Sequence, residues 1–292
     1  MHGDWRQFGW TGTLLLALTA VVTGCRSQPT DLADVLSGDE LARTWAPSNY
    51  RTWIPAQSVL ATAELRGDSL TLRNVRNCQY LTADDYVVRY YDKTCDLRKL
   101  RTVDFVTVPF QESPTLAHTM LSFGFDGGDY VSVSVEARYE QGETYSPVKG
   151  ALRQYELIYV VADERDVIGL RAKHRKDDVY LYRTRATPEM ARALLLDVMA
   201  RANKLAAEPE FYDALSNNCT TNIVAHVNRV QPGRVPLNVG TLLPGYADRL
   251  AYDLGLLDTQ LPFEKLKRQA KIDRVAARYA EEADFSQRIR QR

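Results

Sequence analysis

Cys219 stands where a helix should begin, within the sequence Asn217-Asn218-Cys219-Thr220-Thr221-Asn222. Asparagine is a good helix cap, and the first turn of a helix offers unpaired N–H groups and the positive end of the dipole, which favour a thiolate. Cys219 is therefore a candidate nucleophile. The backbone N–H groups there, with the Asn218 amide, are candidate donors to an oxyanion. The sequence leaves equally open that Cys219 is only a small buried core residue.

A cysteine nucleophile needs a base, and beyond the first residues the chain has three histidines. His226 follows Cys219 by two helical turns, roughly 10 Å, which is too far for a hydrogen bond, so we expect it to be packed or exposed. His174 lies in a charged run that is typical of a solvated loop. His118 is left as the candidate base.

Strand alternation gives His118 possible partners. His118 shares one face of its strand with Met120 and Ser122, and the next strand has a polar face that includes Ser134 and Glu136. A three-residue loop would match the two polar faces and set His118 opposite Glu136 or Arg138. Glu136 could then orient the imidazole with Ser134 as a supporting neighbour. The equally open alternative is that Glu136 simply faces solvent.

The elements around these residues indicate an α+β fold in which an antiparallel sheet packs against helices. Strands are expected at 69–75, 86–91, 103–108, 118–125, 130–138, 156–161 and 179–183. One helix should begin at Thr187-Pro188 and reach about Ala207, and a second should carry Cys219 and end before Pro232. The order His, acid, Cys is that of a circularly permuted papain-like core.

The N-terminus is expected to be a targeting segment. Trp10 to Thr23 is an uncharged apolar run of signal-peptide length, and Val22-Thr23-Gly24-Cys25 resembles the bacterial lipobox. Residues 1–24 would then be a signal peptide, and 25–60 a lipidated Cys25 with a tether and a helix over 40–45. The lipid would anchor the chain to the periplasmic face of the envelope, and Arg26 favours the outer membrane.

Two further cysteines, Cys78 and Cys95, are expected to pair as a disulfide across one hairpin, since the periplasm is oxidising. No residue spacing indicates a metal site, and no cofactor is expected. Lys plus Arg and Asp plus Glu both number 37, so no basic excess favours nucleic acid.

The remaining charged residues are assigned to the surface. Residues 61–260 should form the single domain, and 261–292 should be an amphipathic helix, which we expect to pack on the domain rather than on a membrane. Arg165, Arg171 and Arg175 could bind a carboxylate or phosphate, but exposed surface charge is the favoured interpretation.

Several of these segments resemble one known family. The stretches that begin at His118, Ser132 and Tyr155, and Phe211-Tyr212 with the Cys219 motif, are similar to the bacterial Lnb N-terminal periplasmic domain family over roughly 104–255. That family's His and Asn-Cys-Thr motifs suggest kinship with permuted NlpC-type and lecithin:retinol acyltransferase-like thiol enzymes. The resemblance implies Cys219 as nucleophile and His118 as base, with Glu136 as a third member.

Two functions follow as expectations. The first is a lipid-anchored thiol hydrolase or acyltransferase that acts on an amide or ester carbonyl of a cell-wall peptide or a lipid. The second is an envelope lipoprotein that binds a partner and uses Cys219 only for packing. The state of the Cys219 thiol discriminates between them, because only the enzyme needs a reactive thiolate.

Overall fold

The computed structural model describes residues 46–236 and 243–291. Cys25, the signal peptide and the helix expected over 40–45 lie outside the described residues. The strands are β1 (Thr62–Arg66), β2 (Ser69–Arg76), β3 (Gln79–Tyr80), β4 (Tyr86–Val87), β5 (Tyr90–Asp96), β6 (Leu100–Phe110), β7 (Ser113–Phe125), β8 (Asp129–Arg138), β9 (Tyr155–Ala162), β10 (Tyr180–Arg183) and β11 (Phe211–Tyr212).

Nine of the strands in the described ranges form one sheet in the order β1-β2-β9-β8-β7-β6-β10, with β5 paired to β2 and β11 to β9. The β2–β9 pair is parallel and the other pairs are antiparallel, so the α+β expectation is confirmed. The helices are α4 (Pro147–Ala151), α5 (Glu164–Gly169), the π-helix η3 (Leu170–Arg175), α6 (Pro188–Ala207), α7 (Cys219–Val230), α9 (Ala247–Asp253), α10 (Phe263–Ala270), α11 (Asp273–Arg278) and α12 (Phe285–Arg288), with short 3₁₀ turns η1 (Pro55–Gln57), η2 (Leu97–Lys99) and η4 (Pro244–Tyr246).

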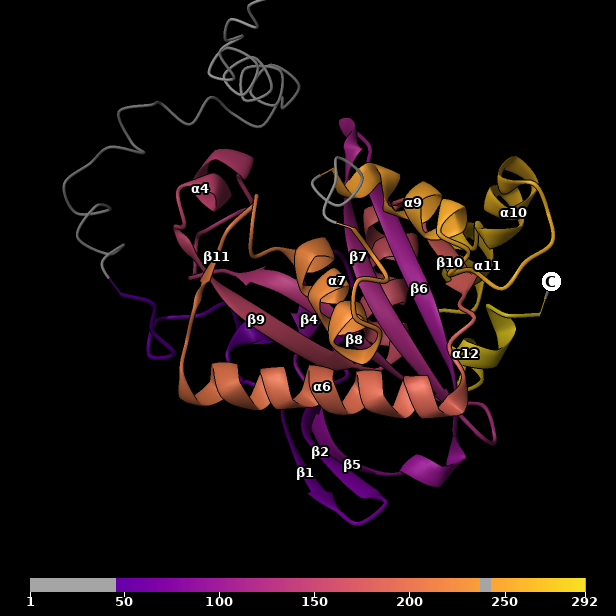
Figure 1. The fold of residues 1–292 in the computed structure, drawn as a ribbon. Coiled ribbons are helices and arrows are strands. Elements are labelled where there is room, and N and C mark those ends of the chain that lie inside the picture. Colours follow the sequence, from indigo (N-terminus) through magenta and orange to yellow (C-terminus); the bar gives the residue numbers. More distant parts are fainter. Residues whose placement is uncertain (1–45, 237–242, 292) are drawn as a thin grey trace, which may run out of the picture.

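Each face of the sheet is covered by its own set of helices. Odd-numbered residues of β7 and β8 such as Leu121 and Val133 belong to one core with residues of α6 and α7, which lie in front of the sheet in Figure 1. Even-numbered residues such as Met120 belong to a second core with residues of α5, η3, α11 and α12. Alternation along one strand therefore sends neighbouring residues into different cores.

The β7–β8 hairpin has the register that the sequence predicts. Met120 pairs with Ser134 and Phe125 with Asp129, so even-numbered residues face even-numbered ones. Three residues, Asp126 to Gly128, form the loop. Gly127 and Gly128 have φ angles of 85° and 79°, a region that glycine adopts without strain. The three-residue loop is confirmed.

Both expected helices begin at their caps. The Thr187 hydroxyl accepts from Met190 N at 3.3 Å before α6, and the Asn218 side chain accepts from Thr221 N at 2.9 Å before α7. These short side chains satisfy N–H groups that have no partner inside the helix. α6 ends at Ala207 and α7 at Val230, as the sequence predicts.

The C-terminal segment differs from the single helix that we expected over 261–292. It forms α10, α11 and α12, and Ile272 N donates to Val179 O between the first two at 2.8 Å. Ile272, Phe285 and Ile289 are buried in the second core. The contact of Ile272 with Val179 interrupts the helix, so that each shorter helix buries its own apolar side chains. The periodicity of the sequence does not reveal this contact.

Arg290 fixes the end of this segment. Its guanidinium donates to Asp104 at 2.7 Å and to Glu164 at 2.5 Å, and it lies 3.5 Å from the centre of the Tyr130 ring. Both carboxylates are buried, so Arg290 supplies the charge that they need inside the protein.

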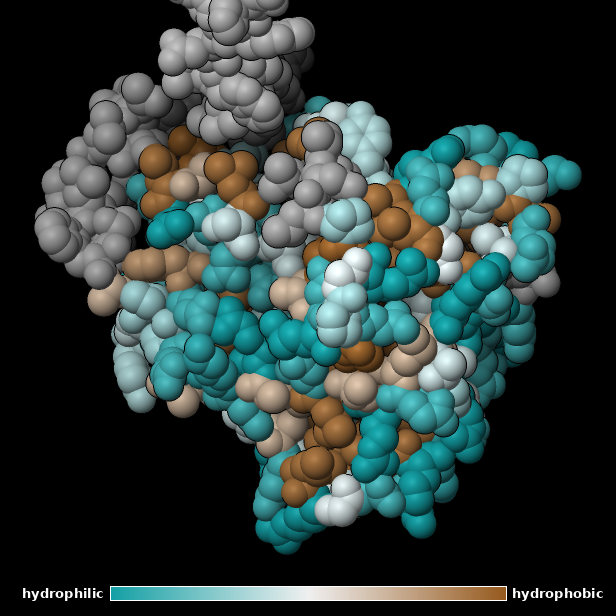
Figure 2. Space-filling view, viewed as in Figure 1, coloured by the Kyte–Doolittle hydropathy of each residue, from teal (hydrophilic) through white to brown (hydrophobic). Residues whose placement is uncertain are grey.

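The expected strand over 86–91 is also wrong, because β4 pairs with β3 in a separate small sheet whereas β5 pairs with β2. Figure 2 shows that hydrophilic residues cover most of one face, with hydrophobic residues gathered over α4, near α9 and near β1 and β2. No helix in the described ranges is long and apolar enough to cross a membrane.

Candidate functional site

His118 lies on β7 and hydrogen-bonds across to β8. Its Nε2 is 2.7 Å from Ser134 Oγ, and Ser134 Oγ donates to Glu136 Oε1 at 2.6 Å. Glu136 Oε1 is itself 3.9 Å from His118 Nε2. The hairpin register explains this arrangement, because all three side chains leave the same face of adjacent strands.

The hydrogen bonds assign the tautomer of His118. The Ser134 hydroxyl gives its only proton to Glu136, so its oxygen must accept from His118 Nε2–H. A neutral imidazole has one N–H, and Nδ1 therefore carries the lone pair. Nothing among the described residues hydrogen-bonds to Nδ1. This nitrogen is the one that could take a proton.

Charged neighbours keep the ring neutral and the carboxyl ionised. Burial, with help from Arg171 and against Glu136, lowers the pKa of His118 to about 3. Burial opposes ionisation of Glu136, but Arg171 and Arg76 prevail and hold the pKa of that carboxyl well below its usual range. At neutral pH the site therefore contains a neutral imidazole and a carboxylate.

Arg171 and Gln57 are the site residues that the sequence missed. Arg171 Nη2 and Gln57 Nε2 each donate to Glu136 at 3.1 Å, to Oε1 and Oε2 respectively. Arg171 is buried on the π-helix η3, so the surface role that we favoured for it is wrong. Arg165 instead donates to Asn77 at 3.2 Å, and Arg175 is exposed.

Cys219 is buried in the first turn of α7 on the other side of β7. Its Sγ is 3.8 Å from the carbonyl oxygen of Ala117, and the hydroxyls of Thr119 and Thr220 are 3.2 Å apart. Ala117 and Thr119 are odd-numbered neighbours of His118, so thiol and imidazole approach the strand from different faces. Within the described structure no hydrogen bond joins Cys219 to His118.

The two groups nevertheless come close to one peptide unit. The carbonyl that Cys219 contacts belongs to the residue directly before His118. The last β7–β8 pair is Met120–Ser134, so the strands are no longer paired where His118 and Glu136 lie. His118 still pairs with Val108 of β6 and Glu136 with Ile158 of β9, so only the pairing between β7 and β8 ends here.

The side chain of Asn218, a candidate oxyanion donor, has hydrogen-bond partners within its own loop and helix. The side-chain nitrogen donates to Ala214 O at 2.7 Å, and the side-chain oxygen caps Thr221 N. The backbone N–H groups of Cys219 and Thr220 have no acceptor among the residues that the structure describes. They are the donors that remain for an oxyanion.

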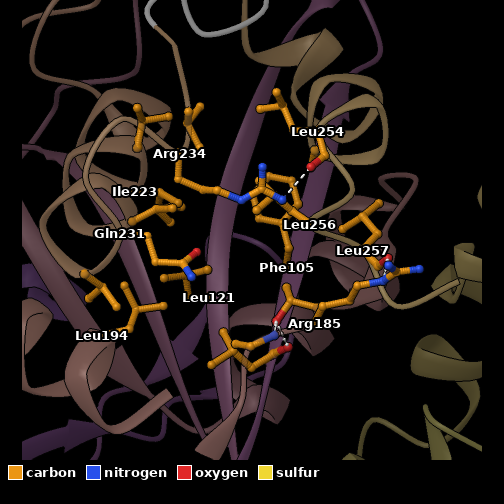
Figure 3. Close-up of a pocket in the computed structure, with 18 of the residues that line it drawn as sticks. Phe105, Leu121, Arg185, Leu194, Ile223, Gln231, Arg234, Leu254, Leu256 and Leu257 are labelled. Carbon is orange, nitrogen blue, oxygen red and sulfur yellow. Dashed lines mark hydrogen bonds between the residues drawn. The ribbon is translucent and has the colours of Figure 1, made fainter. Parts of the chain in front are cut away.

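An apolar pocket of about 310 Å³ lies along α7, next to this turn. Its lining includes Phe105 and Leu121 from the sheet, Leu194 from α6, Ile223 from α7 and Leu254 beyond α9, with Thr220 at one end. Figure 3 shows Arg234 reaching across the pocket to the carbonyl of Leu254. The volume is at the lower end of the range for small-molecule sites, about 300–1,000 Å³.

The expected disulfide is not formed, and Cys78 and Cys95 are both free and buried. Cys95 pairs with Leu70 near the start of β2, whereas Cys78 follows Arg76 at its end. The six residue steps of β2 from Leu70 to Arg76 span roughly 20 Å, well beyond the limit of about 7 Å between bridged Cα atoms. In the described part of the chain, no cluster of His, Cys, Asp and Glu could hold a metal.

The chain was compared with known proteins. No curated protein and no solved structure matches it. One family model matches residues 86–245, a range that contains His118, Ser134, Glu136 and Cys219. The match covers more than half of the 292 residues, and the chain belongs to the family of Lnb N-terminal periplasmic domains.

Proposed function

We propose that this protein is a lipid-anchored periplasmic thiol enzyme that hydrolyses or transfers the acyl group of a lipid ester. Cys219 is the nucleophile and His118 is the base, in a permuted papain-like arrangement of the NlpC type. The observation that carries the proposal is the lone pair on His118 Nδ1, beside the peptide that the Cys219 thiol contacts. A neutral imidazole and a thiol at a helix start, both at the same stretch of β7, are the two groups from which an activated cysteine can be built.

In the first half of the reaction, His118 Nδ1 takes the Cys219 proton and Sγ attacks the ester carbonyl carbon. The backbone N–H groups of Cys219 and Thr220 stabilise the oxyanion. When the C–O bond breaks, the leaving alkoxide takes the proton back from His118, and the acyl group remains on Cys219 as a thioester. Glu136, through Ser134, stabilises the transient imidazolium.

In the second half, water or an acceptor amine or hydroxyl gives its proton to His118 Nδ1 and attacks the thioester carbon; the C–S bond breaks, and the departing Cys219 thiolate takes the proton back. Contact between Sγ and Nδ1 requires β7 to shift where it no longer pairs with β8, because the two groups lie on different faces of this strand. Catalytic hydrogen bonds commonly tighten only when substrate is bound.

The pocket favours a lipid over a cell-wall peptide. Its lining is mainly aliphatic and it reaches Thr220, next to the nucleophile. An acyl chain there would gain about 0.8 kcal/mol for each methylene buried. Lipidation of Cys25 would hold the domain near such substrates, and the outer membrane remains the proposed location.

The test is to trap the thioester. We would incubate the protein with phosphatidylethanolamine vesicles or, separately, with cell-wall tetrapeptide, and then search by mass spectrometry for an adduct on the peptide that contains Cys219. An acyl adduct with the vesicles, absent in Cys219→Ala and retained in the matched Cys95→Ala variant, is the expected result. Cys95 is a suitable control because it is as buried as Cys219, at 4% against 5% exposure.

Other outcomes have definite meanings. An adduct only with the tetrapeptide would keep the nucleophile and overturn the lipid substrate. No adduct with either probe, together with unaltered alkylation of Cys219 in His118→Ala, would favour the non-catalytic binding protein.

A further inference from the structure

A network of hydrogen-bonded polar side chains crosses the interface between α6, α7 and β9. His226 Nδ1 is 2.6 Å from Asp197 Oδ2, and its Nε2 is 2.8 Å from the Tyr159 hydroxyl. Tyr159 donates to Asn222 Oδ1 at 2.9 Å. His226 is only 1% exposed, so it is packed, which is one of the two alternatives that the helical spacing left open.

This network of hydrogen bonds ends at the residues directly before Cys219. Asn222 Nδ2 donates to Asn217 Oδ1 and to Asn218 O, each at 2.9 Å. Asn217 in turn donates to Phe211 O at 2.8 Å. Because both amide protons of Asn222 point toward this turn, its oxygen faces Tyr159, and the tyrosine hydroxyl fixes the orientation of the amide.

The surroundings make the network costly to leave incomplete. Tyr159 and Cys219 belong to the same apolar core, and the neighbouring residues of α6 and α7 include Leu194, Leu195 and Ile223. A buried polar group without a partner is destabilising, so a connected network has a single favourable arrangement. Arg229 contributes from the rim, with Nε 2.8 Å from both Asp197 oxygens.

We infer that Asp197, His226 and Tyr159 are positioning residues that hold Asn217, Asn222 and the first turn of α7 in the geometry that the Cys219 nucleophile requires. The inference rests on the proposed role of Cys219. The network ties three elements, α6, α7 and β9, to the two N–H groups that would face the oxyanion. None of the three residues touches the thiol, so they act through Asn222.

The test compares two tyrosines. Tyr159→Phe removes only the hydroxyl of the network, whereas Tyr182→Phe removes an equally buried hydroxyl that bonds Asp248 at 2.9 Å, in the same core but at the β10 edge of the sheet. Amide hydrogen exchange of the peptide spanning 213–222 is the first readout. We expect exchange there to be several-fold faster in Tyr159→Phe and unchanged in Tyr182→Phe, although both variants lose some thermal stability.

The second readout is the rate at which the Cys219 thioester forms, which should fall several-fold in Tyr159→Phe alone. Equal exchange in the two variants would overturn the inference, whatever the thioester shows. Faster exchange without a thioester in the native protein would keep the positioning role and reject the proposed function. If Tyr159→Phe does not fold, Asp197→Asn perturbs the network from its half-exposed rim and should give the same changes at smaller size.

Discussion

Two histidines, the buried His226 and the half-buried His118, lie on opposite faces of the same sheet, and each has a carboxylate and an arginine nearby. Around His226 these are Asp197 and Arg229, and around His118 they are Glu136 and Arg171. Both nitrogens of His226 have partners, whereas His118 uses Nε2 alone among the contacts that the structure describes. The same components thus make a closed network in one place and a ring with an available lone pair in the other.

The comparison teaches which histidine can react. A ring whose two nitrogens both contact protein groups in the core, as those of His226 do, fixes its surroundings but offers no accessible basic atom to a thiol or a substrate. A ring held at one nitrogen keeps its orientation and its basic atom together. Sequence position suggested His118 for a different reason, by elimination, and the hydrogen bonds supply the chemical one.

The largest effect is expected when each of the two imidazole rings is replaced by an amide. We expect His118→Gln to slow thioester formation on Cys219 by about 10² to 10⁴, the usual contribution of a general base. His226→Gln should slow it by less than about tenfold, because it disturbs only the position of the turn. The measurement is single-turnover mass spectrometry of the Cys219 peptide. Equal losses in the two variants would break the distinction.

Next in size is the effect of the two carboxylates on folding. Glu136→Gln leaves the buried Arg171 guanidinium without its counter-charge, and removal of one partner of a buried pair costs about 3–5 kcal/mol. Asp197 is more exposed, so Asp197→Asn should cost about 1–2 kcal/mol. Urea denaturation at pH 7.5 gives both free energies of unfolding. A larger loss for Asp197→Asn would contradict the burial that the two sites show.

Acid should destabilise the protein through both rings. Burial lowers the pKa of His118 to about 3 and that of His226 to about 4, below the value near 6.5 of an unfolded chain. Between those values the unfolded state binds more protons, so stability falls as pH falls below 6.5. At pH 5 each histidine should contribute a loss of up to about 2 kcal/mol relative to pH 7.5.

Urea denaturation at the two pH values checks this loss, and His226→Gln should lose less stability than the native chain does. Glu136 does not contribute to the loss of stability between pH 7.5 and pH 5. The pKa of its carboxyl is lowered in the folded protein, so its protonation destabilises the fold only below about pH 4.3. A native protein equally stable at both pH values would show that the rings are not buried as neutral groups.

The smallest expected effect concerns the other thiols. Because Cys78 and Cys95 are free, dithiothreitol should leave the melting temperature unchanged. Burial raises the pKa of each to about 11, so both should resist iodoacetamide at neutral pH in the folded protein. Peptide mapping after a timed reaction would show whether Cys219 differs from them. If Cys219 reacts as slowly as the other two thiols, its assignment as the nucleophile is weakened.

Local chemistry explains what the sequence could predict. The alternation in β7 and β8 and the short glycine loop fix the register, and hence the contact of His118 with Ser134. Thr187 and Asn218 mark the starts of α6 and α7 because a cap acts on the next three residues.

The predictions that failed all concern contacts between parts of the chain that are distant in sequence. Arg171 reaches Glu136 over 35 positions, and His226 reaches Tyr159 over 67, so neither sequence neighbourhood contains the partner. The disulfide expectation failed because it assumed a hairpin between Cys78 and Cys95, whereas β5 pairs with β2. No local pattern specifies which strand a segment will choose.

The contact of Arg290 with Asp104 and Glu164 has a consequence for biosynthesis. The two acids are made long before this cation, since 186 and 126 residues separate them from Arg290. Until that segment has been made, Asp104 has Arg183 as its counter-charge, Glu164 has no cation among the described residues, and the second core lacks Phe285 and Ile289. Native packing of the second core therefore has to await synthesis of this segment, and a product that stops before it would be exposed to proteolysis.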